Sequence, residues 1–147
     1  MKCKDVMLTL VFKCNLQSSI TECAQLMRDE HLGFVPVLDE DLKVVGVVTD
    51  RDIAVRVVAE QRDPSTKVSA IMSPAPFLTC APEDDLHELE ERMAKSKKGR
   101  ALVRARDGAL LGIISLSDIA QRERSASRTG KLLKEVTRRE SVSIIRQ

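Results

Sequence analysis

The sequence predicts an α/β (α+β) fold made of two copies of one β-α-β-β-α unit. The first reason is a repeated motif, because GVVTDRDIA at residues 46–54 returns as GIISLSDIA at residues 112–120. The second reason is the register, since Gly33 and Gly99 keep the same offset of 66 residues as the motif. An ungapped repeat of this length indicates two similar units that pack into one small protein.

The first unit is expected to begin with an apolar strand over Val6–Leu16. A helix from Ser19 follows, because a Glu three positions later has capping-box spacing and the apolar residues then recur every three or four positions. Strands over Phe34–Leu38 and Lys43–Val48 come next, separated by an acidic turn. A second helix over Asp50–Ala59 closes the unit, with acidic residues in its first turn.

The second unit repeats this order. A Pro-rich stretch leads into a strand over Pro76–Cys80, and the acidic run Pro82–Asp85 is expected to start a helix. Strands over Arg100–Ala105 and Ala109–Ser115 and a helix from Ser117 complete it. Gly33 and Gly99 follow the last periodic turn of the first helix in each copy, as C-terminal glycines do.

Four segments follow from this pattern. They are a first repeat over residues 1–60, a linker over 61–71, a second repeat over 72–124 and a basic segment over 125–147. The net charge of the chain is +2, but Gln121–Gln147 holds eight Lys and Arg against three Glu. SASRTG, at residues 125–130, is expected to be a flexible link before a short helix and an extended end. This segment could pack on a partner subunit, contact nucleic acid or be disordered when free.

Composition excludes several classes of function. The 147 residues are 43% apolar and 31% charged, with three Phe and no Trp or Tyr, so base-stacking platforms for single-stranded nucleic acid are not expected. No run of about 18 apolar residues predicts a membrane span. The four cysteines form no Cys-x-x-Cys pair, so we expect reduced thiols in a cytoplasmic protein and no metal site. No catalytic constellation is recognisable, and an enzyme is not expected.

Thr49-x-x-Asp52 and Ser115-x-x-Asp118 occupy the same strand-to-helix junction in the two copies. Helix capping alone explains such a pattern, and a cap contributes about 1 kcal/mol. The same junction also suits a nucleotide, because free backbone N–H groups at a helix N-terminus hold phosphate and a nearby Asp accepts hydrogen bonds from ribose hydroxyls. No Rossmann or P-loop glycine motif is present.

At these residues the chain, over about Val6–Arg124, resembles a tandem pair of CBS domains, named after cystathionine β-synthase. The resemblance implies a pseudo-two-fold module whose cleft between the repeats binds adenosine-containing ligands such as AMP, ADP, ATP or S-adenosylmethionine. It also implies that two modules pair into a homodimer. The adenine nucleotide would be a regulatory ligand, with no obligatory cofactor.

The resemblance also implies roles for individual residues. Asp52 and Asp118 would hold ribose hydroxyls. Phosphate would be held by Thr49, Ser115, Arg51 and Arg100. The adenine would lie near Cys14, Asn15, Gly33, Cys80 and Ala81. The second copy departs from the first by having Leu116-Ser117 in place of Asp50-Arg51, so the two sites are not expected to be equivalent.

The sequence therefore predicts a non-enzymatic regulatory module that senses an adenine nucleotide and changes its shape or its affinity for an unidentified regulated protein. An alternative is a dimerisation scaffold with vestigial nucleotide clefts that acts through its basic C-terminal segment. A third hypothesis is nucleic-acid binding by that segment. Loss of the segment would abolish partner or nucleic-acid binding in the last two cases but leave ligand binding intact in the first.

Overall fold

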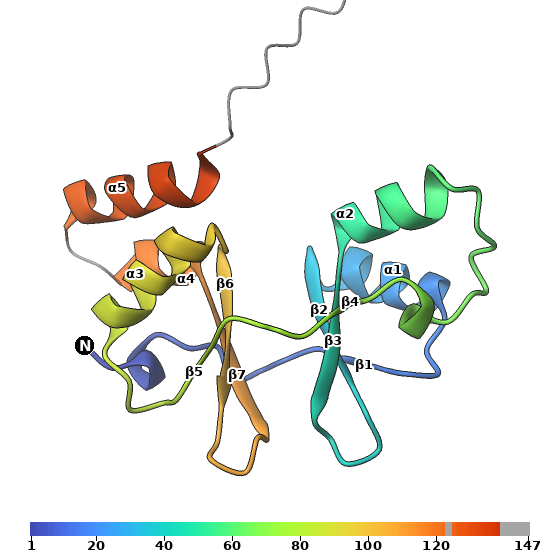
Figure 1. The fold of residues 1–147 in the computed structure, drawn as a ribbon, viewed down its shortest axis with the longest axis horizontal. Helices are drawn as coiled ribbons and strands as arrows, with labels where there is room; N and C mark the ends of the chain where they lie inside the picture. The colour runs from blue at the N-terminus through green and yellow to red at the C-terminus, as the bar shows by residue number, and fades with distance from the viewer. Residues whose placement is uncertain (123–124, 139–147) are drawn as a thin grey trace, which may run out of the picture. The chain divides into compact units, whose positions relative to one another are not determined.

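A computed structural model describes residues 1–122 and 125–138 (Figure 1). Contacts divide these residues into two compact units. The first-repeat unit comprises Leu10–Phe77 with Arg106–Leu110. The second-repeat unit comprises Met1–Thr9, Leu78–Ala105 and the described residues from Leu111 onward.

The first-repeat unit is built on a sheet with the strand order β1-β2-β3-β4. Its strands are β1 (Cys14–Asn15), β2 (Phe34–Leu38), β3 (Val44–Thr49) and β4 (Ser73–Pro74). β1 runs parallel to β2, and the other neighbouring strands are antiparallel. Its helices are α1 (Ile20–Asp29), α2 (Asp50–Ile53), which continues as the π-helical turn η2 (Ala54–Val58), and the 3-10 helix η3 (Val68–Ala70). Aliphatic and sulfur-containing side chains fill the core, among them Val35, Val37, Val48, Cys23 and Met27.

The second-repeat unit has a sheet with the order β5-β6-β7. Its strands are β5 (Thr79–Cys80), β6 (Arg100–Arg104) and β7 (Leu110–Ser115). Its helices are η1 (Cys3–Asp5), α3 (Leu86–Ser96), α4 (Leu116–Arg122) and α5 (Ala126–Thr137). The core includes Leu89, Met93, Val103, Ile114 and Ile119. Two β-α-β-β-α repeats confirm the predicted fold class.

Each sheet takes an edge from a segment that precedes the other repeat in the sequence. In the second-repeat unit, Leu8 forms an antiparallel bridge with Ile113, and the Cys3 amide donates to the carbonyl of Asp84 at 3.0 Å. In the first-repeat unit, β4 pairs with β3, and the Val68 amide donates to the carbonyl of Ser18 at 2.9 Å. The segment before the first repeat therefore completes the second-repeat sheet, and the segment before the second repeat completes the first-repeat sheet.

This arrangement explains the glycine that opens the repeated motif. A side chain at Gly46 would overlap the Met72 side chain, which lies just before β4. A Cβ atom at Gly112 would lie 2.7 Å from the Leu8 carbonyl oxygen. Real Cβ atoms essentially never approach another atom so closely, so Gly112 leaves room for a backbone oxygen and Gly46 leaves room for a side chain that would otherwise have to move.

The N-terminal strand predicted over Val6–Leu16 is wrong in extent. Only Cys14–Asn15 is a strand, because β2 is five residues long and β1 pairs with its last two residues, Val37 and Leu38. Within the predicted range Leu8 forms an isolated bridge with Ile113, and η1 lies just before that range, at residues 3–5. The linker predicted over 61–71 differs as well, because Val68 and Ile71 are buried in the core of the first-repeat unit.

Two helix boundaries, one in the second repeat and one in the basic segment, also differ from the prediction. α3 begins at Leu86 rather than at Pro82, because Asp85 is its N-cap and accepts from the His87 amide at 2.8 Å. The flexible link predicted over residues 125–130 lies largely within α5, whose N-cap is Ser125. The extended end predicted after this helix falls on residues 139–147, outside the described residues.

Gly33 and Gly99 are not the C-terminal glycines that the sequence suggested. The left-handed residues after α1 and α3 are His31 (φ 55°) and Lys97 (φ 53°), and neither glycine has a positive φ. The two glycines instead lie where the following helix approaches closely. The Gly33 carbonyl accepts from the Asp50 amide at 3.3 Å, and the Gly99 carbonyl accepts from the Leu116 amide at 3.0 Å.

Candidate functional site

The first junction, between β3 and α2, contains a closed capping box. The Thr49 hydroxyl accepts from the Asp52 amide at 3.1 Å, and Asp52 Oδ2 accepts from the Thr49 amide at 2.9 Å. The box uses one carboxylate oxygen of Asp52, whose side chain is only 12% exposed. The other oxygen, Oδ1, lies 3.7 Å from Nη2 of Arg56, which is too long for a direct hydrogen bond.

The second junction, between β7 and α4, repeats this box with tighter bonding. Asp118 Oδ2 accepts from the Ser115 amide at 2.7 Å and from the Ser115 hydroxyl at 2.5 Å. The Ser115 oxygen accepts in turn from the Asp118 amide at 3.3 Å. The capping function that the motif suggests is therefore present in both copies, and it uses the Oδ2 oxygen in each.

Arg56 and Arg122 are equivalent residues that the sequence analysis missed. Arg56 Nη1 donates to the Ile71 carbonyl at 2.6 Å, and Arg122 Nη1 donates to the Asp5 carbonyl at 3.2 Å. Each arginine therefore ties the helix after the junction to the segment that supplies the edge of its own sheet. The available signal was an Arg four residues after the motif Asp in both copies.

The place where the residue before β2 meets the first residue of α2, here called the corner of the first junction, is polar. A Cβ atom at Gly33 would lie 2.9 Å from Asp50 Oδ2, so the glycine leaves room for this carboxylate. Asp50 Oδ1 accepts from the Arg51 amide at 2.8 Å, and both residues are exposed. Phe34, which begins β2, pairs with Thr49 across the sheet. The structure thus brings Gly33, Arg51 and the Thr49–Asp52 box to one end of the sheet.

The corresponding corner of the second repeat is apolar. A Cβ atom at Gly99 would lie 3.3 Å from Leu116 Cδ1 and 3.8 Å from Val136 Cγ1 of α5. Arg100 follows Gly99 at the start of β6 and is exposed. Arg100 therefore lies beside the corner of the second junction, which adjoins the Ser115–Asp118 box. The first helix residue at this corner is Leu116.

Of the adenine residues suggested by the resemblance, all except Gly33 lie away from the junctions within each unit. Cys14 pairs with Val37, three residues along β2 from Phe34 and so roughly 10 Å from the Thr49 end. Cys80 pairs with Val103 in the same way, and both cysteines are buried. Asn15 and Ala81 follow these cysteines and lie farther from the junctions along the chain. Within a unit, the structure does not bring these four residues to the motif Asp.

The buried thiols have different environments. Hydrogen bonding by the Cys23 thiol, and then by Ser18, lowers the pKa of Cys14, whereas the same Cys14 contact and burial raise the pKa of Cys23. Burial and the nearby Cys3 raise the pKa of Cys80 to about 12. Burial also raises the pKa of Cys3. All four cysteines are free.

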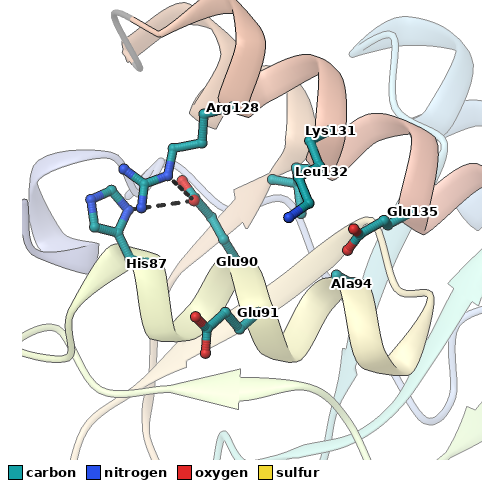
Figure 2. Close-up of a pocket in the computed structure, with 8 residues that line it drawn as sticks. All are labelled: His87, Glu90, Glu91, Ala94, Arg128, Lys131, Leu132 and Glu135. Atoms are coloured by element: carbon teal, nitrogen blue, oxygen red, sulfur yellow. Dashed lines mark ion pairs between the residues drawn. The ribbon is translucent and has the colours of Figure 1, made fainter.

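A groove of about 200 Å³ lies between α3 and α5 and is lined mostly by charged side chains (Figure 2). Figure 2 shows Arg128 and His87 directed toward Glu90, which is 6% exposed. Arg128 Nε lies 3.3 Å from Glu90 Oε2, and His87 Nδ1 lies 3.4 Å from the same oxygen. The sequence gives no sign of this cluster, because nothing in the pattern of α3 shows that one of its glutamates is buried.

The described part of the chain has neither a candidate membrane span nor a cluster of candidate metal ligands. None of its helices has the length and apolar character needed to cross a membrane. Over residues 1–122 and 125–138, no three His, Cys, Asp or Glu side chains lie close enough to share a metal ion.

Comparison with known proteins identifies the family. The model of the CBS domain matches twice, at residues 3–59 and 68–124, so the chain belongs to the CBS domain family. The CBS domain-containing protein YhcV of Bacillus subtilis is 32% identical over 134 residues, which cover 91% of this chain and 94% of YhcV.

Solved structures share the fold. A conserved CBS domain protein of unknown function from Thermoplasma acidophilum has a TM-score of 0.78 at 20% identity, covering 92% of this chain and 75% of that one. The CBS domain pair of protein MJ0100, crystallised with 5′-methylthioadenosine and S-adenosyl-L-methionine, has a TM-score of 0.74 at 22% identity. That likeness covers 83% of this chain and 94% of the other.

Proposed function

We propose that this chain is a regulatory module that binds an adenosine-containing nucleotide at its Thr/Ser-x-x-Asp junctions. Ligand binding would change the conformation of the module or its affinity for a regulated protein. The ligand must bind one state more tightly than the other for this to happen, typically by about 1–3 kcal/mol. The module would act by binding rather than by catalysis.

The observation that carries the proposal is the carboxylate of Asp52. Its capping bond occupies Oδ2, while Oδ1 has a cation 3.7 Å away. A ribose diol offers two O–H donors, and a largely buried carboxylate with one oxygen outside the capping bond suits that geometry. The exposed Arg51 beside this junction would supply positive charge to the phosphates. The adenosine compounds bound by the CBS pair of MJ0100 support the same ligand class.

Asp52→Asn tests the ribose contact, because the amide oxygen can still accept from the Thr49 amide. We expect affinity for the best of AMP, ADP, ATP and S-adenosylmethionine to fall about 10- to 100-fold, since a hydrogen bond to a charged group contributes roughly 1.5–3 kcal/mol. Calorimetry measures the affinity. Asp41→Asn, in the exposed β2–β3 turn, is the matched control and should bind as the wild type does.

No binding of any of these ligands at submillimolar concentration would contradict the proposal. Because the chain has no Trp or Tyr, a co-purified adenine would also be visible as absorbance near 260 nm in the protein as isolated. Equal affinity in wild type and Asp52→Asn would keep the ligand class but remove Asp52 from the site.

We propose in addition that two copies of the chain associate as a homodimer. The helical run of α2 and η2 exposes Val58 (71%) and Val55 (46%), an arrangement that favours burial against another surface. Val58→Lys should shift the protein toward the monomer in light scattering. The equivalent position in the second repeat, 124, is already an arginine. A wild type that is monomeric at tens of micromolar would contradict this part of the proposal.

A further inference from the structure

Helix α5 docks on the second-repeat unit through one stripe of its surface. Arg128, Leu132 and Val136 follow each other at four-residue intervals and share a helix face. Leu132 is 6% exposed and belongs to the core cluster that contains Met93, while Val136 packs against that cluster. Figure 1 shows α5 lying along α3 and α4, and the contacts between these helices agree.

A buried charge holds the other end of the stripe. Glu90 on α3 is almost fully buried, and a buried carboxylate is costly unless a cation accompanies it. Arg128 supplies this cation from α5 at 3.3 Å, and His87 lies 3.4 Å from the same oxygen. The equivalent of Glu90 in the first repeat is Ala24, so α1 offers no such anchor.

The docked helix ends at the corner of the second junction. Val136 Cγ1 would lie 3.8 Å from a Cβ atom at Gly99, whose carbonyl accepts from the Leu116 amide. Leu116 packs against the same core cluster as Val136. At the equivalent corner of the first repeat, the carboxylate of Asp50 is exposed. The second repeat thus has Leu116 where the first has Asp50, and this apolar residue is at the corner on which α5 packs.

We propose that α5 is a built-in cap on the second junction, which restricts the ligand to the first junction as long as the helix is docked. This inference rests on the proposed function. A phosphate beside Leu116 and Val136 would lose water without gaining polar partners from these side chains, whereas the corner with Asp50 and Arg51 remains hydrated. Ligand binding at the Ser115–Asp118 box then requires α5 to undock, so the ligand and the docked helix compete.

Val136→Asp in the full chain tests the cap, and Leu133→Asp is its matched control. Leu133 is 50% exposed on the same helix, so its replacement adds the same charge outside the docking stripe. We expect the wild type and Leu133→Asp to bind one AMP per chain, with an affinity that Asp52→Asn weakens and Asp118→Asn does not. Val136→Asp should bind two, and Asp118→Asn in that background should remove the second.

Hydrogen exchange of α5 in the same samples separates the possible failures. Exchange should be slow in the wild type and Leu133→Asp and at least tenfold faster in Val136→Asp. Equal exchange in all three proteins would overturn the docking, and one site in Val136→Asp despite a released helix would overturn the cap. Wild-type binding that Asp118→Asn abolishes would also overturn it. If no protein binds AMP or the other adenosine ligands, the proposed function fails, and the exchange data alone decide whether α5 docks through Val136.

Discussion

The two strand-to-helix junctions have the same motif but different surroundings. Both close a capping box, with Asp Oδ2 accepting from the amide of Thr49 or Ser115. Beside the first box the corner residue is the exposed Asp50, while beside the second it is Leu116, which packs against the same core cluster as Val136 of α5. The motif alone therefore specifies how the helix begins. Under the proposed function, the neighbouring residue and the helix beside it would determine which junction accepts a charged ligand.

The largest expected difference between the two repeats is in the stability lost when the motif glycines Gly46 and Gly112 are replaced. Gly112→Ala places a Cβ atom 2.7 Å from a backbone oxygen, whereas Gly46→Ala meets the Met72 side chain, which can change rotamer. We expect Gly112→Ala to lower the free energy of unfolding by about 2–3 kcal/mol, and Gly46→Ala by roughly 1–2 kcal/mol. Urea unfolding measures both. A smaller loss in Gly112→Ala than in Gly46→Ala would contradict the view that the Leu8 carbonyl yields less readily than the Met72 side chain.

The equivalent cysteines should differ in reactivity. The pKa of Cys14 is lowered by hydrogen bonding from Cys23, while burial raises the pKa of Cys80 to about 12. Because the thiolate is the nucleophile, native Cys14 should react with iodoacetamide at pH 8 at least about tenfold faster than Cys80. Peptide mass spectrometry after short labelling measures the ratio. Denatured protein is the control, in which the two rates should converge, and equal rates in the native state would refute the difference.

The smallest expected difference is in the stability contributed by Arg56 and Arg122, which bond the helix after each junction to the segment at the edge of its sheet. Arg56 is partly buried and donates to the Ile71 carbonyl at 2.6 Å, whereas Arg122 is exposed and donates at 3.2 Å. Arg56→Met should cost about 1 kcal/mol of stability and Arg122→Met about 0.5 kcal/mol. Thermal unfolding resolves the order of the two variants. The reverse order would indicate that the interaction with the Asp5 carbonyl is the stronger one.

Much of the fold could be predicted because the repeat fixes the order of its elements. Ser19 was recognised as a helix cap, and the structure confirms its capping box with Glu22. The ends of strands were harder to predict, since the apolar run from Val6 to Leu16 has no partner along most of its length. The sequence pattern shows which residues are apolar, but it does not show how many residues of the neighbouring strand are able to pair with them.

The candidate site was predictable only for contacts between residues that are close in the sequence. Thr49 and Asp52 lie three residues apart, so their contact follows from helix geometry. The pairing of Arg128 with Glu90 joins two helices, and no local pattern reveals it. The assignment of Cys14 and Cys80 to the adenine came from resemblance, and their side chains are buried in the cores. Their role in ligand binding stays a prediction.

A crystal structure of the full chain with the tightest-binding of AMP, ATP and S-adenosylmethionine tests the central claim most directly. The account predicts one ligand per chain, with ribose hydroxyls within hydrogen-bonding distance of Asp52 and with α5 still docked on Glu90. A ligand whose ribose is held by Asp118 beneath a docked α5 would contradict it.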